Sequence, residues 1–212
     1  MNVKKRKICI AISLLTLFVL WTVLVRFIDV KMIGPNESSV GFSSFNQVVH
    51  NFTGVNWFLY TLTDWLGLVP IAVAFGFFVL CFVQLIIRKR LDRVDYNILA
   101  LGVFYIVVIL VYLFFEIIVI NYRPVLINGY LEASYPSSTT MLVMCVMPTA
   151  AMQFNMRIKN AVFRRCIVVA IILFIAFMVV GRIIAGVHWI TDIIGGILFS
   201  AGMVVIYDAL ID

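Results

Sequence analysis

Residues 97–120 read NILALGVFYIVVILVYLFFEIIVI, with Glu116 as their single charged side chain. About 20 apolar residues are enough to cross a bilayer as a helix. Backbone amides must be paired within the segment where no water reaches them, so the many Val, Ile and Phe residues do not favour a strand here. The stretch therefore predicts a transmembrane helix and excludes a water-soluble domain.

Apolar runs of similar length lie on both sides of this helix. Of the 212 residues, 64% are hydrophobic and 12% are charged, against about 45–50% apolar residues in soluble domains. The length suits one domain, so residues 1–212 are expected to form a single all-α polytopic membrane bundle. Its six predicted spans are 8–25, 66–87, 97–120, 138–154, 167–183 and 189–206.

Basic residues are concentrated before the first span and in the loops that follow the second and fourth spans. The positive-inside rule places these segments, and with them both termini, in the cytoplasm. The net charge of +6 is then explained by anionic lipid at that membrane face, and no nucleic-acid partner is expected. The four cysteines lie in or beside apolar runs without the spacing of a metal site, so neither a metal nor a cofactor is expected.

Residues 26–65 form the longest loop predicted on the outer side. The apolar run before it is long for a signal peptide and is followed by no small-residue cleavage site, so it is expected to remain as an anchor. Gly34-Pro35 interrupts the loop, and the aromatic-rich stretch 42–65 is a candidate interfacial helix. His50, within that stretch, is interpreted as a surface histidine rather than a catalytic one.

Polar residues converge in the short outer loop between the fifth and sixth spans. His188 and Asp192 are four residues apart, so on a helix they share a face and can hydrogen-bond. A carboxylate on one imidazole nitrogen leaves the other nitrogen free to attack. Arg182 comes just before them, and its guanidinium fits phosphate oxygens. An Asp inside a membrane is costly, which favours a functional interpretation over a helix cap.

A second polar segment follows the third span on the same predicted face. Pro136 and the hydroxyl residues Ser137, Ser138 and Thr139 suit the start of the fourth helix. A helix N-terminus offers unpaired amides and a positive dipole end, so an anion can bind there. With Arg123 at the end of the third span, the two outer turns predict a site for phosphate esters.

These residues resemble the motifs of the type 2 phosphatidic acid phosphatases, a family related to the vanadium haloperoxidases. That family carries Lys-x6-Arg-Pro, Pro-Ser-Gly-His and Ser-Arg-x5-His-x3-Asp. The third motif is matched by Arg182, His188 and Asp192, with Gly181 in place of its Ser. The resemblance extends over residues 66–206 and implies a six-helix bundle of the lipid phosphatase type with an outward-facing site.

The other two motifs are degenerate in this sequence. Arg123 matches the first, but Glu116 stands where that motif has Lys. Ser137 matches the second, but Ser138 and Thr139 replace its Gly and His. A phosphate-binding Lys and the His that protonates the leaving group in the family are therefore missing here.

The resemblance also implies a mechanism with named roles. His188 would attack phosphorus and form a phosphohistidine, and Asp192 would orient the ring. Arg123 and Arg182 would clamp the phosphoryl oxygens, and Ser137 would add a hydrogen bond. No metal takes part in this chemistry.

The replaced residues leave two roles open. The Thr139 hydroxyl does not titrate near neutral pH, so a general acid is missing, and such an acid is typically worth about 10²–10⁴-fold. A diphosphate would suffer less, because its phosphate leaving group needs less protonation. Three accounts of Glu116 stay open: it pairs with Arg123 or Arg182, which we favour, it is protonated and supplies the proton, or it contacts a cationic headgroup.

The function expected is a phosphatase or phosphotransferase for lipid phosphates or diphosphates at the outer leaflet of a bacterial cell membrane. The alternative is a catalytically impaired homologue that binds lipid phosphate headgroups. A small transporter has less support, because no inverted repeat is visible. By resemblance alone, the candidate lipids are undecaprenyl diphosphate, phosphatidylglycerol phosphate and phosphatidic acid.

Overall fold

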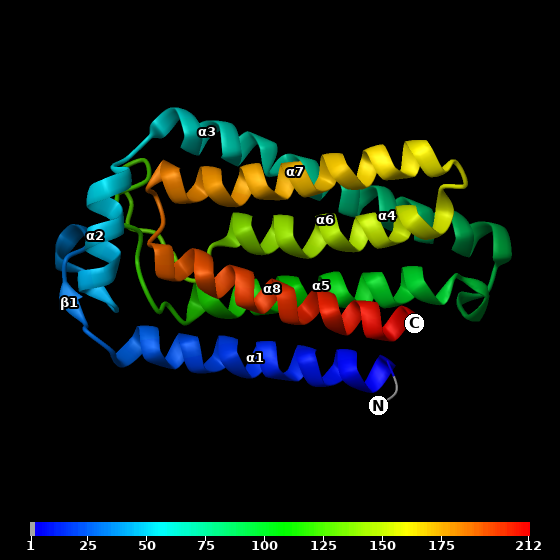
Figure 1. The fold of residues 1–212 in the computed structure, drawn as a ribbon, viewed down its shortest axis with the longest axis horizontal. Coiled ribbons are helices and arrows are strands. Elements are labelled where there is room, and N and C mark those ends of the chain that lie inside the picture. The colour runs from blue at the N-terminus through cyan, green and yellow to red at the C-terminus, as the bar shows by residue number, and fades with distance from the viewer. Residues whose placement is uncertain (1–2) are drawn as a thin grey trace.

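The computed structural model describes residues 3–212. Its long helices run side by side along the longest axis of the molecule (Figure 1). They are α1 (Val3–Phe27), α4 (Leu68–Arg88), α5 (Tyr96–Ile117), α6 (Ser138–Arg157), α7 (Ala161–Ala185) and α8 (Ile190–Ile211). A helix therefore lies over each of the six ranges in which the sequence predicts a span, although the third of them ends at Ile117 rather than at residue 120.

Five helical stretches among residues 3–212 are long and apolar enough to cross a membrane, and α6 is not one of them. Helix α6 lies in the middle of the bundle (Figure 1) and packs against α4, α5, α7 and α8. Its polar side chains Thr140, Thr149 and Gln153 are buried among these neighbours. A helix that faces protein needs fewer apolar residues than one that faces lipid, so the lower hydropathy of α6 fits its central place. The number of helices that cross the membrane stays a prediction.

The predicted outer loop 26–65 is largely folded, and the second apolar helix starts earlier than the sequence suggests. Helix α3 (Trp57–Leu66) leads into α4 through Gly67, and the apolar stretch runs from Trp57 to Arg88. Helix α3 packs against α7, which brings part of the expected loop onto the bundle.

The rest of this segment covers one end of the bundle (Figure 1). It contains a two-stranded antiparallel sheet, formed by β1 (Lys31–Met32) and β2 (Ser39–Val40) on either side of a short 3₁₀ turn, η1 (Pro35–Glu37). Helix α2 (Ser43–Thr53) follows and exposes Phe45, Val48 and Phe52. These exposed apolar side chains suit the predicted interfacial helix.

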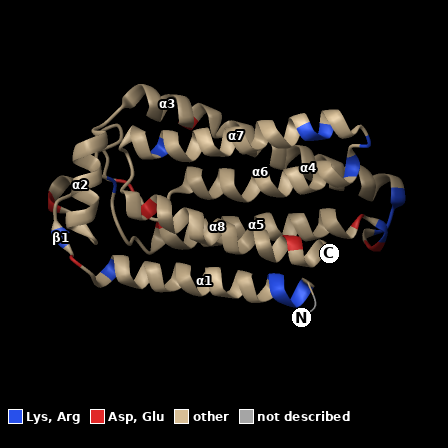
Figure 2. Ribbon diagram, in the orientation of Figure 1, with Lys and Arg blue, Asp and Glu red and all other residues tan. Residues whose placement is uncertain are grey.

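The two ends of the bundle differ in charge. Both termini, the α4–α5 connection with its 3₁₀ turn η2 (Leu91–Arg93) and the α6–α7 connection lie at one end, where the lysines and arginines gather (Figure 2). Lys7 ties α1 to the chain end there, with Nζ 2.7 Å from Asp212 and 2.9 Å from Asp208. The segments that the positive-inside rule groups together are thus on one side, and the assignment of that side to the cytoplasm stays a prediction.

Candidate active site

Two connections that are far apart in the sequence meet at the end opposite the basic cluster. The α5–α6 connection folds back on itself through an isolated bridge between Tyr122 and Ala133. The backbone N–H of Ser137 donates to the carbonyl of Asp192 at 3.0 Å, and Trp189 Nε1 donates to the carbonyl of Tyr122 at 2.8 Å. These bonds join the α5–α6 connection to the start of α8. The structure therefore brings the two predicted polar segments together.

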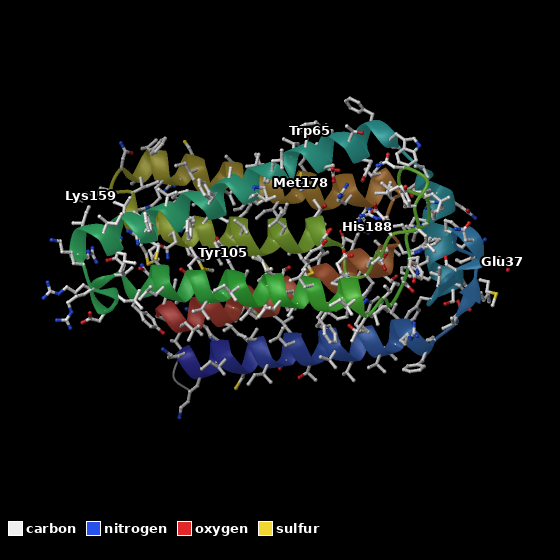
Figure 3. The ribbon with its side chains drawn as sticks, turned by 180° about the vertical axis from the view of Figure 1, so that it is seen from behind. Glu37, Trp65, Tyr105, Lys159, Met178 and His188 are labelled. Carbon is white, nitrogen blue, oxygen red and sulfur yellow. The ribbon has the colours of Figure 1, made fainter. Side chains whose placement is uncertain are left out.

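His188 lies between these segments and is buried (Figure 3 labels it at the end that carries Glu37). Its Nε2 lies 3.2 Å from Nη1 of Arg123. Its Nδ1 lies 3.0 Å from the hydroxyl and 3.2 Å from the carbonyl of Ser134. Burial, reinforced by the charges of Arg123 and Arg182, holds the pKa of His188 well below its usual range. The imidazole is therefore neutral at neutral pH, as a nucleophile must be.

Asp192 does not bond His188 directly, which corrects the expectation from their spacing. Its carboxylate accepts from the Ser134 hydroxyl at 2.5 Å, from the Trp189 backbone N–H at 2.9 Å and from Asn121 Nδ2 at 3.3 Å. The reason is local: α8 begins at Ile190, so His188 precedes the helix and the four-residue rule does not apply to it. Asp192 instead caps the N-terminus of α8, and Ser134 lies between the carboxylate and the ring.

Arg182 projects from the last turn of α7 and is almost completely buried. Its Nη2 donates to Thr139 Oγ1 at 2.5 Å and to Asp64 Oδ1 at 3.3 Å, and its Nη1 donates to Thr63 Oγ1 at 3.3 Å. The guanidinium also lies 5.1 Å from the centre of the Tyr60 ring, close enough for a cation–π contact. Residues from α3 and α6 thus hold Arg182 in place.

Gly181, which replaces the Ser of the third motif, explains how α3 reaches Arg182. A Cβ added at Gly181 would lie 2.9 Å from Thr63 Cγ2, closer than carbon atoms approach each other. Because Gly181 has no side chain, α3 can pack against α7 at this point. The close approach brings Thr63 and Asp64 to the guanidinium.

Arg123 is also buried, and its partner is Glu132 rather than Glu116. Nε of Arg123 lies 3.1 Å from Glu132 Oε2, and the Arg123 backbone N–H donates to the Glu132 carbonyl at 3.1 Å. Glu116 is exposed and lines a cavity of about 520 Å³ together with Arg123 and Glu132. The favoured pairing of Glu116 with an arginine is therefore wrong, because Arg123 pairs with Glu132 and Arg182 pairs with Asp64.

The hydroxyl residues at the start of α6 have different surroundings. Ser137 precedes the helix and accepts from Thr140 Oγ1 at 3.1 Å. Thr139, at the position of the missing His, contacts Arg182. Ser138 is half-buried and lines the 520 Å³ cavity together with Arg123. Of the three, Thr139 is the one that bonds a predicted phosphate-binding arginine.

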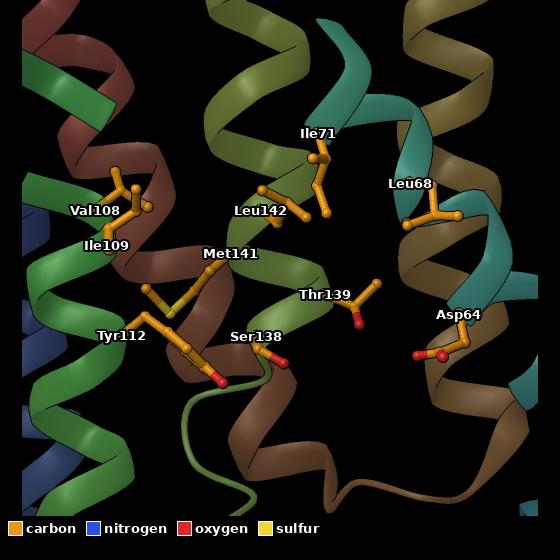
Figure 4. A pocket seen from close by; sticks show the side chains of 11 residues that line it. Asp64, Leu68, Ile71, Val108, Ile109, Tyr112, Ser138, Thr139, Met141 and Leu142 are labelled. Atoms are coloured by element: carbon orange, nitrogen blue, oxygen red, sulfur yellow. The ribbon is translucent and has the colours of Figure 1, made fainter. Parts of the chain in front are cut away.

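A second cavity, of about 410 Å³, lies between α4, α5 and α6 (Figure 4). Its walls are apolar, with Leu68, Ile71 and Leu142 among them, whereas hydroxyls of Ser138 and Thr139 lie at one end. Ser138 also lines the cavity beside Arg123. An apolar groove therefore adjoins the polar site.

His50 is not the surface histidine that the sequence suggests. It is half-buried on α2, and its ring centre lies 5.4 Å from that of Trp189. It lines a small pocket together with His188, and burial lowers its pKa. His50 therefore packs behind the site without a bond to any of the predicted site residues.

Several contacts of the site were not predicted from the sequence. Ser134 and Asn121 both lie in the polar segment that follows the third span, and a signal was present in their closeness to Arg123 and Ser137. Asp64 lies on α3, in the stretch interpreted as a loop, and only its fold onto α7 brings it to the site. Among residues 3–212, no group of three or more His, Cys, Asp or Glu side chains is placed to hold a metal ion.

Comparisons with known proteins agree with the overall fold. Residues 118–210 match the model of the PAP2 superfamily. The fold is similar to the crystal structure of a transmembrane PAP2-type phosphatidylglycerolphosphate phosphatase from Bacillus subtilis, with a TM-score of 0.52 and 17% identity over 94% of this chain and 93% of that one. No curated protein matches the chain. The matched fold and the apolar helices make this chain an integral membrane protein.

Proposed function

Because the chain belongs to the PAP2 superfamily, the type 2 phosphatidic acid phosphatases, we propose that it is a lipid phosphate or diphosphate phosphatase that works through a phosphohistidine at His188. The observation that carries the proposal is the buried, neutral imidazole whose Nε2 lies 3.2 Å from the Arg123 guanidinium. The enzyme is a hydrolase or, with an alcohol in place of water, a phosphotransferase.

In the proposed reaction the lone pair of His188 Nε2 attacks phosphorus. The Nε2–P bond forms, the P–O bond to the lipid breaks, and its electron pair leaves on the lipid oxygen. Arg123 and Arg182 hold the phosphoryl oxygens, since each guanidinium has several N–H donors and both are buried where such donors act strongly. Water then attacks phosphorus: a new P–O bond forms, the Nε2–P bond breaks with its electron pair returning to the ring, and the phosphate and the lipid oxygen take up the protons of water.

The leaving group limits the substrates that this site can turn over quickly. Thr139 bonds Arg182 through its hydroxyl and has no proton to give near neutral pH. A lipid diphosphate releases a phosphate group, which needs less protonation than an alkoxide does. We therefore place lipid diphosphates ahead of phosphatidic acid as substrates.

The apolar groove between α4, α5 and α6 supports a lipid substrate (Figure 4). Burial of a hydrocarbon chain there would stabilise the complex by about 25 cal/mol per Å² of apolar surface. The site lies at the end opposite the basic residues (Figure 2), so with six membrane-crossing helices it faces the outer leaflet of a bacterial cell membrane.

Phosphate release by the purified protein tests the proposal. The panel contains undecaprenyl diphosphate, phosphatidylglycerol phosphate and phosphatidic acid in detergent micelles. His188→Ala is expected to abolish turnover, whereas His50→Ala, the matched change at the other histidine, should keep turnover within about threefold. Unchanged release by His188→Ala would refute the proposal.

A second function is favoured by the replacement of two motif residues. Thr139 stands in place of the acid, and Glu116 adds a negative charge to the cavity beside Arg123. A protein with these changes would bind phosphate headgroups without efficient turnover. Binding of orthovanadate to the wild type, together with no phosphate release from any lipid of the panel, would support this alternative.

A further inference from the structure

Ser134 lies between the carboxylate of Asp192 and the ring of His188, a place that the third motif does not assign to any residue. Its hydroxyl is 2.5 Å from Asp192 Oδ2 and 3.0 Å from His188 Nδ1. We propose that Ser134 is a positioning residue that couples Asp192 to His188 and selects Nε2 as the attacking nitrogen. The catalytic consequence rests on the proposed function, whereas the coupling itself does not.

The direction of each hydrogen bond follows from what the groups can donate. An ionised carboxylate only accepts, so the Ser134 O–H points to Asp192. The Ser134 oxygen is then free to accept, and the Ser134 carbonyl, 3.2 Å from Nδ1, can do nothing else. His188 Nδ1 must therefore carry the proton, and Nε2 must present its lone pair.

The other side of the ring leads to the same tautomer. Arg123 Nη1 lies 3.2 Å from Nε2, and a guanidinium has only donors. It can bond Nε2 only if that nitrogen is unprotonated. The partners on both sides of the imidazole therefore favour the same tautomer, with the proton on Nδ1. Ser134 supplies the oxygen atoms that accept the hydrogen bond from Nδ1.

The backbone around Ser134 holds the hydroxyl in place. The Ser134 N–H donates to the Asn121 carbonyl at 2.9 Å, and the side chain of Asn121 also bonds Asp192. The next residue, Tyr135, is buried, and its hydroxyl lies 2.7 Å from Thr22 Oγ1 on α1. The hydroxyl of Ser134 is therefore anchored through α1 and α8 as well as through its own loop.

Tyr135 can pack this closely because of a glycine on α8. A Cβ added at Gly195 would lie 2.6 Å from the Tyr135 ring, so only glycine fits there. The packing sets the position of the segment that carries Ser134 relative to the first turn of α8, where Asp192 lies.

The arrangement matters most once the phosphohistidine has formed. The Nδ1 proton stays on the ring, so phosphorylation of Nε2 leaves a positive charge on the imidazole. The carboxylate of Asp192 stabilises that charge through the Ser134 hydroxyl. Without the hydroxyl, the ring could turn, or it could carry its proton on the nitrogen that must attack.

Kinetics of Ser134→Ala and Ser134→Thr test the positioning role, with p-nitrophenyl phosphate and phosphatidic acid as probes. Removal of the outer partner that orients a metal-binding histidine typically costs about 10- to 100-fold, and we take this as the scale for the loss of the Ser134 hydroxyl. We expect kcat of Ser134→Ala to fall by about that factor, while KM changes less than about threefold. Ser134→Thr keeps a hydroxyl and should recover most of kcat. Ser200→Ala removes another buried serine hydroxyl, on α8, and should leave kcat unchanged.

A measurement that needs no turnover separates this inference from the proposed function. In ¹⁵N-histidine-labelled protein, the His188 nitrogen shifts should report the Nδ1–H tautomer in the wild type and a mixture in Ser134→Ala. Asp192→Asn should also disturb the tautomer, because the new amide can donate to the Ser134 oxygen.

The outcomes are distinct. If the wild type hydrolyses none of the lipids yet shows the Ser134-dependent tautomer, the proposed function fails and the coupling stands. If Ser134→Ala keeps both the tautomer and kcat of the wild type, the coupling is refuted whatever the activity. If kcat falls in Ser134→Ala, but the tautomer of His188 does not change and Ser134→Thr does not restore kcat, Ser134 has a merely structural role. That result also refutes the inference.

Discussion

The two ends of the helix bundle both hold arginine–carboxylate pairs, but they differ in how those pairs are satisfied. At the basic end, Arg157 donates through Nε to Gln153 at 3.0 Å and through Nη2 to Asp95 at 3.1 Å, and its side chain stays partly exposed. At the site end, Arg123 and Arg182 are buried: Nε of Arg123 makes an ion pair with Glu132 at 3.1 Å, whereas Nε of Arg182 has no partner.

Such unsatisfied donors are costly when buried, and most proteins avoid them. The other buried side-chain atoms without a partner among residues 3–212 lie at the site end too, in Ser38, Ser43 and His50. The basic end thus uses charge to join helices, whereas the site end keeps a buried N–H donor, Nε of Arg182, without a partner. The proposed function assigns phosphate binding to Arg123 and Arg182, and a structural role is left to Arg157.

The largest difference between the two ends is expected when one arginine at each end is replaced by lysine. Arg182→Lys keeps the charge but loses the fork of N–H donors, and we expect kcat/KM for lipid phosphate to fall about 10²–10³-fold, as when a transition-state donor is lost. The matched change Arg157→Lys should leave kcat/KM within about twofold. Equal losses in the two variants would contradict the division of roles between the two ends.

A second prediction concerns the site end alone, where a histidine can be restored at the position of the missing general acid. Thr139→His, tested alone and together with Glu116→Lys, is expected to raise hydrolysis of phosphatidic acid about 10- to 100-fold, up to the lower limit of the range of about 10²–10⁴-fold for general acid catalysis. A diphosphate, which needs the acid less, should gain less. Measured rates for the two substrate classes would decide this, and a uniform loss of activity would show that the geometry of the family site has not persisted.

The pH dependence of kcat/KM should report the burial of His188. Its pKa is held well below 6.5, first by desolvation and then by Arg123 and Arg182, and in the proposed mechanism the neutral ring is the nucleophile. Activity lost through protonation of His188 should therefore fall only well below pH 6.5. Arg123→Gln removes a nearby positive charge and should move this acid limb to higher pH. A wild-type limb at or above pH 6.5 would contradict the buried, neutral ring.

The smallest effect is expected from a substitution at the basic end, Asp95→Asn, which should change stability and not activity. Hydrogen bonds from Arg88, Gln84 and Arg157 hold the pKa of Asp95 at about 2, below its ordinary value. The stability that Asp95 contributes is therefore present above its unfolded pKa of about 4 and is lost as the pH falls toward 2. Asp95→Asn should lower the free energy of unfolding by about 1 kcal/mol at neutral pH in detergent, without an effect on kcat.

Helix positions could be predicted from the sequence because bilayer thickness leaves few alternatives for a long apolar run. The predicted runs that contain Phe77, Phe104, Phe174 and Phe199 are all helical. The fold of 26–65 could not be predicted, because Thr63 and Asp64 reach Arg182 only through the contact of α3 with Gly181. That contact joins segments more than a hundred residues apart.

Membrane topology predicted that the two outer turns meet, and the structure brings His188 to Arg123, but the four-residue spacing gave the wrong partner for the imidazole. The four-residue rule assumes that His188 and Asp192 share one helix, and α8 begins between them at Ile190. Likewise, the pairing of Glu116 with Arg123 assumed a helix that continues past Ile117. The helix ends there, and the returning part of the α5–α6 connection offers Glu132 instead.

The most direct measurement is to look for phosphate on the protein during turnover. The wild type is mixed with undecaprenyl diphosphate, quenched in alkali within milliseconds to preserve phosphohistidine, and digested for mass spectrometry. The account predicts phosphate on His188 in the wild type and none in His188→Ala. Turnover of the lipid with His188 unmodified at every quench time, or with phosphate on another residue, would contradict it.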